Sequence, residues 1–209
     1  MKTIAIALLF TLSINLQAQF FPAPQAQYVG IRSDEFEGIT SSQRTPVWCW
    51  AACIQMVLNY YEVDITQEEI ARRTFGSDWY GNPPAIGGSA EIISRNLNNW
   101  NVDRRGAPYA VSSSVYRGSP DAATIIGHLS QRKPIILAYG PNSQSGHVVV
   151  VTSVSYVIDQ FGYPSITTVI VRDPFPDVWN SQTRGRREYP NGYLPEPVQW
   201  MWLVDVSRR

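Results

Sequence analysis

The chain has 209 residues, which suits one ordinary domain and is short for two. Apolar residues make up 44% and charged residues 16% of it, a balance that excludes a disordered or low-complexity protein. Its 17 basic and 17 acidic residues cancel, so it lacks the positive charge of a nucleic-acid-binding protein. No apolar run reaches the roughly 20 residues of a membrane-spanning helix. We therefore expect no membrane span and no nucleic-acid partner.

The first residues have the pattern of a signal peptide. Lys2 provides a positive start, and Ile4 to Leu16 form an apolar stretch that is too short to cross a bilayer. Cleavage near Ala18 makes residues 1–18 the signal peptide; the alternative is a buried first helix. The signal-peptide interpretation predicts a secreted or periplasmic protein.

The only two cysteines, Cys49 and Cys53, are expected to be free thiols. On one helix, a spacing of four residues sets the Cβ atoms about 5–6 Å apart. A disulfide requires about 3.5–4.5 Å between them. Because exported proteins usually pair their cysteines, two free thiols indicate that at least one is retained for its chemistry.

Helical patterns dominate the first two thirds of the chain. Residues 19–42 have little periodicity and predict an N-terminal arm with a short strand at Tyr28–Ile31. A capping box or a proline after a serine marks the start of several predicted helices. The predicted helices run from Cys49 or just before it, from Thr66 to about Phe75, from Ser89 to about Asn98, and from Pro120 to about Arg132.

The pattern changes to strands after the last of these helices. β-Branched or aromatic runs bounded by turn residues lie at Pro134–Tyr139, Val148–Val157, Ser165–Arg172 and Val198–Val206. Residues 161–164 fit the turn of a hairpin between two of them. Helices followed by antiparallel strands predict an α+β fold. Residues 174–197 are predicted to be a long irregular loop, and loops of that length are usually functional.

Cys49 has the placement of a nucleophile. A thiolate in the first turn of a helix is stabilised by the positive end of the helix dipole, which lowers the pKa of the thiol. Gln43 lies six residues earlier, where its amide N–H can reach the oxygen of a carbonyl under attack. Together with the backbone N–H of Cys49, it would form an oxyanion hole with two donors.

The general base is predicted to be His147, which opens an apolar strand and follows Gly146. A glycine at that position lets a substrate backbone come close. The next strand ends at Asp173, and a hairpin brings the start of its first strand beside the end of its second. Asp173 can therefore lie beside His147 and orient the imidazole, in the manner of a catalytic triad.

These residues resemble the papain-like cysteine peptidases. Gln43, the run Cys49-Trp50-Ala51, Gly146-His147 and Asp173-Pro174 match the oxyanion-hole glutamine, nucleophile helix, histidine and aspartate of that family. The compact bacterial branch is most similar, namely the bacteriocin-processing peptidases and the papain-like avirulence effector proteases. The resemblance implies a papain-like fold in which the nucleophile helix packs on an antiparallel sheet, with the peptidase domain at residues 43–209.

The sequence also departs from the papain pattern. The first cysteine of the Cys-Gly-Ser-Cys-Trp signature is absent, and His147 follows Cys49 by 98 residues rather than about 130–150. These differences argue against cathepsin-like specificity and not against the compact branch. The expected function is a peptidase acting on a peptide or protein. Transglutaminase-like acyl transfer and a catalytically silent binding domain are the alternatives.

Two further expectations concern the surroundings of the site. Trp50 and Trp79 are predicted to line the substrate cleft together with Gly146. Cys49, Cys53 and the two histidines are the right ligand types for zinc, but two cysteines four apart on one helix do not have the spacing of a zinc site. We therefore expect no metal. We also expect that the protein uses no cofactor and is a monomer.

Overall fold

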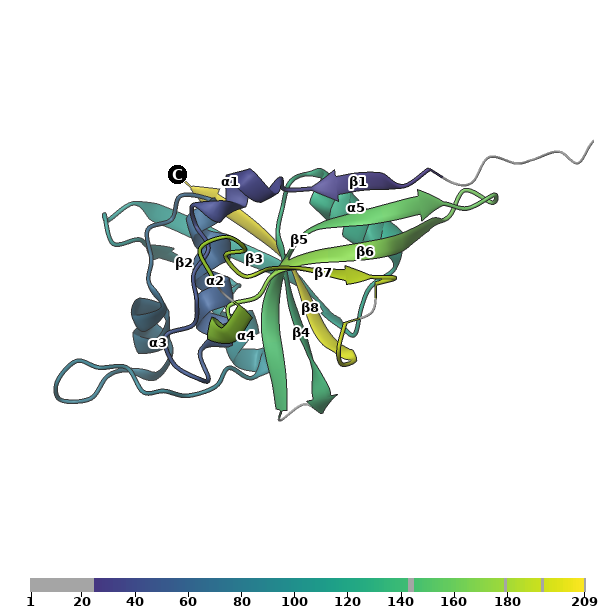
Figure 1. Ribbon diagram of the computed structural model, residues 1–209. Coiled ribbons are helices and arrows are strands. Elements are labelled where there is room, and N and C mark those ends of the chain that lie inside the picture. The colour runs from purple at the N-terminus through teal and green to yellow at the C-terminus, as the bar shows by residue number, and fades with distance from the viewer. Residues whose placement is uncertain (1–24, 143–144, 179, 193, 209) are drawn as a thin grey trace, which may run out of the picture.

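The computed structural model describes residues 25–142, 145–178, 180–192 and 194–208. The predicted signal peptide, residues 1–18, lies outside these ranges. Most of the helices gather on one side of a large antiparallel sheet, and one helix, at residues 122–130, lies on its other side (Figure 1). None of the described helices has the length and hydropathy of a membrane-crossing helix. The α+β class expected from the sequence is confirmed.

Four helices begin within about two residues of their expected starts, and a fifth, at Ser33–Glu37 in the N-terminal arm, was not expected. In chain order they are α1 (Ser33–Glu37), α2 (Cys49–Tyr60), α3 (Gln67–Phe75), α4 (Ala90–Asn96) and α5 (Ala122–Ser130), followed by a short 3-10 turn, η1 (Pro176–Val178). Thr66 and Ser89 cap α3 and α4 through their hydroxyl oxygens. The helix expected from Pro120 starts later, because Asp121 accepts the N–H of Thr124 and is itself the cap.

The sheet is entirely antiparallel and contains more strands than the sequence predicted. Its strands are β1 (Gln27–Gly30), β2 (Asn99–Val102), β3 (Pro108–Arg117), β4 (Ile135–Asn142), β5 (Ser145–Ile158), β6 (Pro164–Arg172), β7 (Arg186–Pro190) and β8 (Val198–Arg208). Their order is β2-β3-β8-β4-β5-β6-β7, and β1 pairs with β5. The prediction missed β2, β3 and β7, so residues 174–197 are not irregular throughout.

Alternating side chains of the central strands fill two cores on opposite faces of the sheet. Ile136 on β4 and Val150 on β5 pack with α2 in the larger core. Ile135 and Leu137, one residue to either side on β4, pack with Leu129 of α5 in the second core. This period of two is what a strand buried on both faces requires. As a result α2 lies directly against the strand that carries His147.

Residues 25–42 belong to the same folded unit as the sheet and the helices. β1 pairs with β5 through Gln27↔Tyr156, and Ile31 donates its N–H to the carbonyl of Thr152 at 2.9 Å. Phe36 of α1 is fully buried and stacks on Tyr60, with ring centroids 5.5 Å apart. The N-terminal arm is therefore packed into the fold from residue 27 onward. The domain boundary at residue 43 stays a prediction.

Candidate active site

The nucleophile helix presents Cys49 at its start. Cys49 is the first residue of α2, and Trp48 before it provides no side-chain cap. The N–H groups of the first turn therefore point outward without a side-chain partner, and they carry the positive end of the helix dipole. Cys49 is partly exposed and lines a cleft. A thiolate at this place would be stabilised by the helix.

His147 and Asp173 meet because two neighbouring strands run in opposite directions. His147 lies near the start of β5, and Asp173 follows the last residue of β6. Nε2 of His147 lies 2.6 Å from Oδ1 of Asp173. The same oxygen accepts the N–H of Phe175 at 2.9 Å. Nδ1 is therefore the ring nitrogen left to interact with Cys49, which lines the same cleft.

The partners of His147 favour its charged form. Burial alone would lower the pKa of the imidazole, but the interactions with Asp173 and Cys49 outweigh that cost and raise this pKa to about 9. Burial likewise opposes ionisation of Asp173, and its bonds to His147, Phe175 and Arg187 hold the pKa of this carboxyl below its usual range. The site therefore favours a charged imidazolium beside a charged carboxylate.

Two aromatic rings hold the imidazole edge-on. Tyr139, the partner of His147 across the β4–β5 ladder, lies 5.7 Å away with the rings at 85°. Phe175 lies 6.0 Å away at 84° on the loop after Asp173. Such T-shaped pairs stabilise a defined ring orientation. The imidazole is thus fixed by packing as well as by its carboxylate.

Gln43 is tied to the loop that follows Asp173. Its backbone N–H donates to the carbonyl of Pro174 at 2.8 Å, and Ser42 Oγ donates to the same oxygen at 3.3 Å. The Gln43 side chain lines the cleft beside Cys49 and donates from Nε2 to the carbonyl of Thr45 at 2.9 Å. One hydrogen of this NH₂ group remains for a ligand, because an amide nitrogen carries two.

Cys53 lies one turn further along α2 in a different environment. It is fully buried and donates from Sγ to the carbonyl of Val148 at 3.2 Å. Burial raises the pKa of this thiol well above its usual range. Neither cysteine forms a disulfide, as the spacing predicted. Of the two thiols, only Cys49 has the surroundings of a nucleophile.

The cleft around Cys49 has a volume of about 970 Å³. One wall is the segment from Gly87 to Ile93, and the opposite wall comes from β4, β5 and β8 and includes Gly146 as expected. The aromatic side chains that line it are Tyr139, Phe175, Trp200 and Trp202. Its volume lies at the upper end of the range of about 300–1,000 Å³ that is typical of ligand-binding clefts.

The two tryptophans predicted to line the cleft do not do so. Trp50 is 1% exposed, packs beneath Gly88 and donates from Nε1 to the carbonyl of Ile86 at 3.1 Å. It is buried because the second position of α2 faces the core. Trp79 is 96% exposed on the loop between α3 and α4, outside the cleft lining. Trp50 supports the cleft wall from behind.

Sequence reasoning missed Arg187, which faces Asp173 from β7. Its Nη1 lies 3.2 Å from Oδ2 of Asp173, and its side chain lines the cleft. The sequence offered only the pair Arg186-Arg187 within residues 174–197, which were predicted to be an irregular loop. Which of the two arginines turns toward Asp173 depends on the register of β7 on β6.

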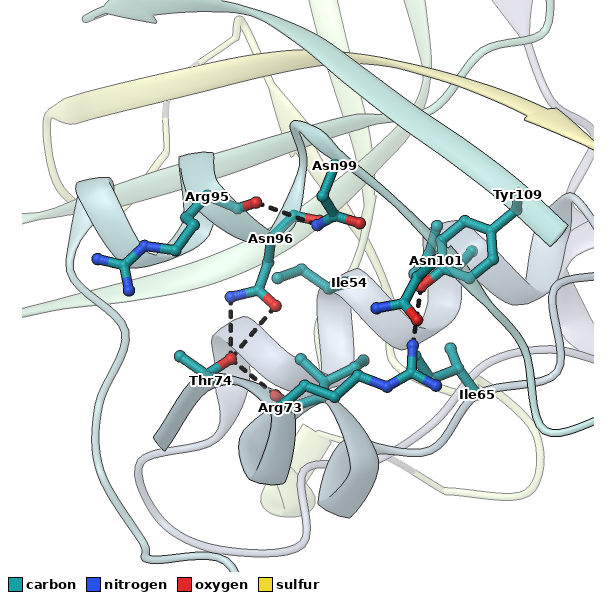
Figure 2. A pocket seen from close by; sticks show the side chains of 11 residues that line it. Ile54, Ile65, Arg73, Thr74, Arg95, Asn96, Asn99, Asn101 and Tyr109 are labelled. Atoms are coloured by element: carbon teal, nitrogen blue, oxygen red, sulfur yellow. Dashed lines mark hydrogen bonds between the residues drawn. The ribbon is translucent and has the colours of Figure 1, made fainter. Parts of the chain in front are cut away.

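A smaller cavity of about 190 Å³ lies between α2, α3, α4, β2 and β3 (Figure 2). Its polar side chains bind mainly one another: Asn96 bonds Thr74, and Arg73 donates to the hydroxyl of Tyr109. It shares no lining residue with the cleft and contains no cysteine or histidine. Within the described ranges, no three His, Cys, Asp or Glu side chains gather as a metal site.

A thiol at the start of a helix, packed against an antiparallel sheet that carries histidine and aspartate, defines the class of papain-like cysteine peptidases. The sequence profile of the peptidase C39-like family matches residues 34–198. The chain belongs to this family and is a cysteine-type peptidase by class. No curated protein sequence matches it significantly.

Two solved structures are among those similar to this chain. One is a double glycine motif protease from an AMS/PCAT transporter, solved with a leader peptide. It is 18% identical, with 80% of this chain and 89% of that chain covered and a TM-score of 0.43. The other is the peptidase domain of Streptococcus ComA, a bifunctional ABC transporter involved in quorum sensing. It is 13% identical, with 81% and 97% covered and a TM-score of 0.48.

Proposed function

We propose that this chain is an exported peptidase that hydrolyses peptide bonds through Cys49, His147 and Asp173. The observation that carries the proposal is the position of His147, which lines the same cleft as Cys49 and has Nε2 2.6 Å from Oδ1 of Asp173. Family membership supports the peptidase class. Export rests on the signal-peptide pattern of residues 1–18 alone.

The reaction begins with attack of the Cys49 thiolate on the carbonyl carbon of a peptide bond. A C–S bond forms and the carbonyl oxygen takes the negative charge. His147 then gives its Nδ1 proton to the leaving amine as the C–N bond breaks, which leaves an acyl-enzyme. The neutral imidazole next takes a proton from water, and the resulting attack breaks the C–S bond and releases the acid.

Gln43 and the helix start would stabilise the oxyanion. The free hydrogen on Gln43 Nε2 and the backbone N–H of Cys49 border the same cleft. Two donors that already point at the developing oxyanion lower the barrier, because no group has to move during the reaction. One such donor is worth about 10²–10³ in kcat. Gly146 leaves room for a substrate backbone beside His147.

The test is to map cleavage sites by mass spectrometry in a peptide library, with Cys49→Ala as the blank. We expect new termini with the parent protein and none with the variant, because alanine supplies no nucleophile. Products joined to an added primary amine would instead indicate acyl transfer. An unreactive Cys49 toward a thiol-directed probe would indicate a silent binding domain. An uncut N-terminus on protein recovered outside the cytoplasm would contradict the signal peptide.

A further inference from the structure

Arg187 contacts the candidate triad on the side away from His147. The two oxygens of Asp173 are divided: Oδ1 bonds His147 and the N–H of Phe175, and Oδ2 lies 3.2 Å from Nη1 of Arg187. The Asp173 side chain is only 1% exposed. Solvent therefore does little to stabilise the negative charge of this carboxylate. Its hydrogen-bond and ion-pair partners set its orientation.

The guanidinium of Arg187 is held in place from its own strand. Arg187 lies opposite Val171 in the β6–β7 ladder, and its charged end sits 5.6 Å above the ring of Tyr189 two residues on. Its side chain is 40% exposed. Among the described residues, Asp173 is the only carboxylate to which it is ion-paired. Arg186 beside it bonds Ser33 and Glu188 instead.

We infer that Arg187 is a positioning residue of the peptidase, which fixes Oδ2 of Asp173 so that Oδ1 faces His147 throughout the reaction. The inference rests on the function proposed above. In that reaction His147 gives up its proton to the leaving amine and becomes neutral. Asp173 then has no charge partner on that side, and a buried carboxylate without one is costly. Arg187 keeps the carboxylate paired at this step.

The electrostatic consequence has a definite sign. A cation favours the deprotonated form of every nearby group, so its removal raises their pKa values. Asp173 is directly affected, since its bond to Arg187 helps to hold the pKa of that carboxyl low. The other titratable groups that face this pair are His147 on β5, Cys49 and Cys53 on α2, Tyr139 on β4 and Tyr189 on β7.

The experiment compares Arg187→Gln, which removes the charge, with Arg187→Lys, which keeps it. Arg186→Gln is the matched control on the same strand. We expect kcat of Arg187→Gln to fall about tenfold with KM unchanged, the scale typical of residues that orient a reacting group. Both limbs of its pH–rate profile should move to higher pH by about half a unit. Lysine should restore the profile and part of the rate, and the control should match the parent.

A second measurement does not depend on turnover. The chain has only two histidines, so NMR can follow His147 in Cys49→Ala protein with His128 as an internal reference. Adding Arg187→Gln should raise the pKa of His147 and leave that of His128 unchanged. An unmoved His147, or a raised KM with unchanged kcat, would overturn the inference; the second result would make Arg187 a substrate-binding residue. If Cys49→Ala still cleaved peptides, the proposed function would fail while this titration still tested the pairing.

Discussion

The two thiols of α2 differ in their surroundings although they lie on the same helix. Cys49 opens the helix and borders the cleft together with His147, whereas Cys53 is fully buried against β5. The bond from Cys53 Sγ to the carbonyl of Val148 joins the nucleophile helix to the residue after His147. Cys53 therefore acts on the site only through the packing of α2 on β5.

Iodoacetamide at neutral pH should modify Cys49 and leave Cys53 unmodified until the protein unfolds. The reason is that alkylation requires an accessible thiolate, and burial raises the pKa of Cys53. Peptide mass mapping of native and urea-treated protein checks this. Cys53→Ser should keep most activity, since a serine hydroxyl can donate to the same carbonyl, while Cys49→Ser should abolish turnover. Labelling that follows Cys53 would contradict the assignment of the nucleophile.

One wall of the cleft can pack as it does only because residue 88 is a glycine. Gly88 lies against the indole of Trp50, and a Cβ at this position would come within 2.5 Å of the ring. Gly87, its neighbour in the same wall, has nothing within 4 Å of such a Cβ. Because Trp50 is fixed by its bond to Ile86, the added methyl cannot be absorbed by a ring movement alone.

Gly88→Ala should therefore destabilise the protein by about 1–3 kcal/mol, the usual cost of overpacking a core. It should also raise KM, because the segment that must shift borders the cleft. Gly87→Ala is the matched control and should change the free energy of unfolding by less than about 0.5 kcal/mol. Urea unfolding and peptide-cleavage kinetics measure the two effects. Equal stability of the two variants would show that the wall moves freely.

At the scale of the whole molecule, Arg172 joins segments that are far apart in the chain. This arginine is 1% exposed and precedes Asp173. Its guanidinium donates to the carbonyl of Ser33 in α1 at 2.9 Å and to that of Thr183 at 3.0 Å. The carbonyl of Gly185, close to the second contact, accepts the N–H of Asp173 at 2.7 Å. The N-terminal helix and the candidate active site are thus held by one side chain.

Arg172→Met should lower the free energy of unfolding by about 2–4 kcal/mol, since it removes the charged hydrogen bonds by which this buried guanidinium joins Ser33 to Thr183. Arg117→Met, at the exposed end of β3, should have almost no effect and serves as the control. Denaturant unfolding measures both. If the two variants were equally stable, the hydrogen bonds of Arg172 would contribute nothing to the stability of the fold.

The local features of this protein were determined by its sequence alone. The starts of α3 and α4 follow from their capping residues, and β4, β5, β6 and β8 follow from β-branched runs. The pairing of His147 with Asp173 was also predictable, because a hairpin brings together residues from the ends of its two strands. Each of these features depends on neighbours in the chain or on one simple turn.

Only the tertiary structure decided the rest. The missed strands are polar, charged or proline-containing, and they are strands because β3 has β8 and β7 has β6 to pair with. Trp50 turned away from the cleft because the core on that side had room for a large ring. The choice of Arg187 over Arg186 as the partner of Asp173 follows from strand register, which no local pattern contains. Contacts between distant segments set these features, and a single sequence does not show which segments will meet.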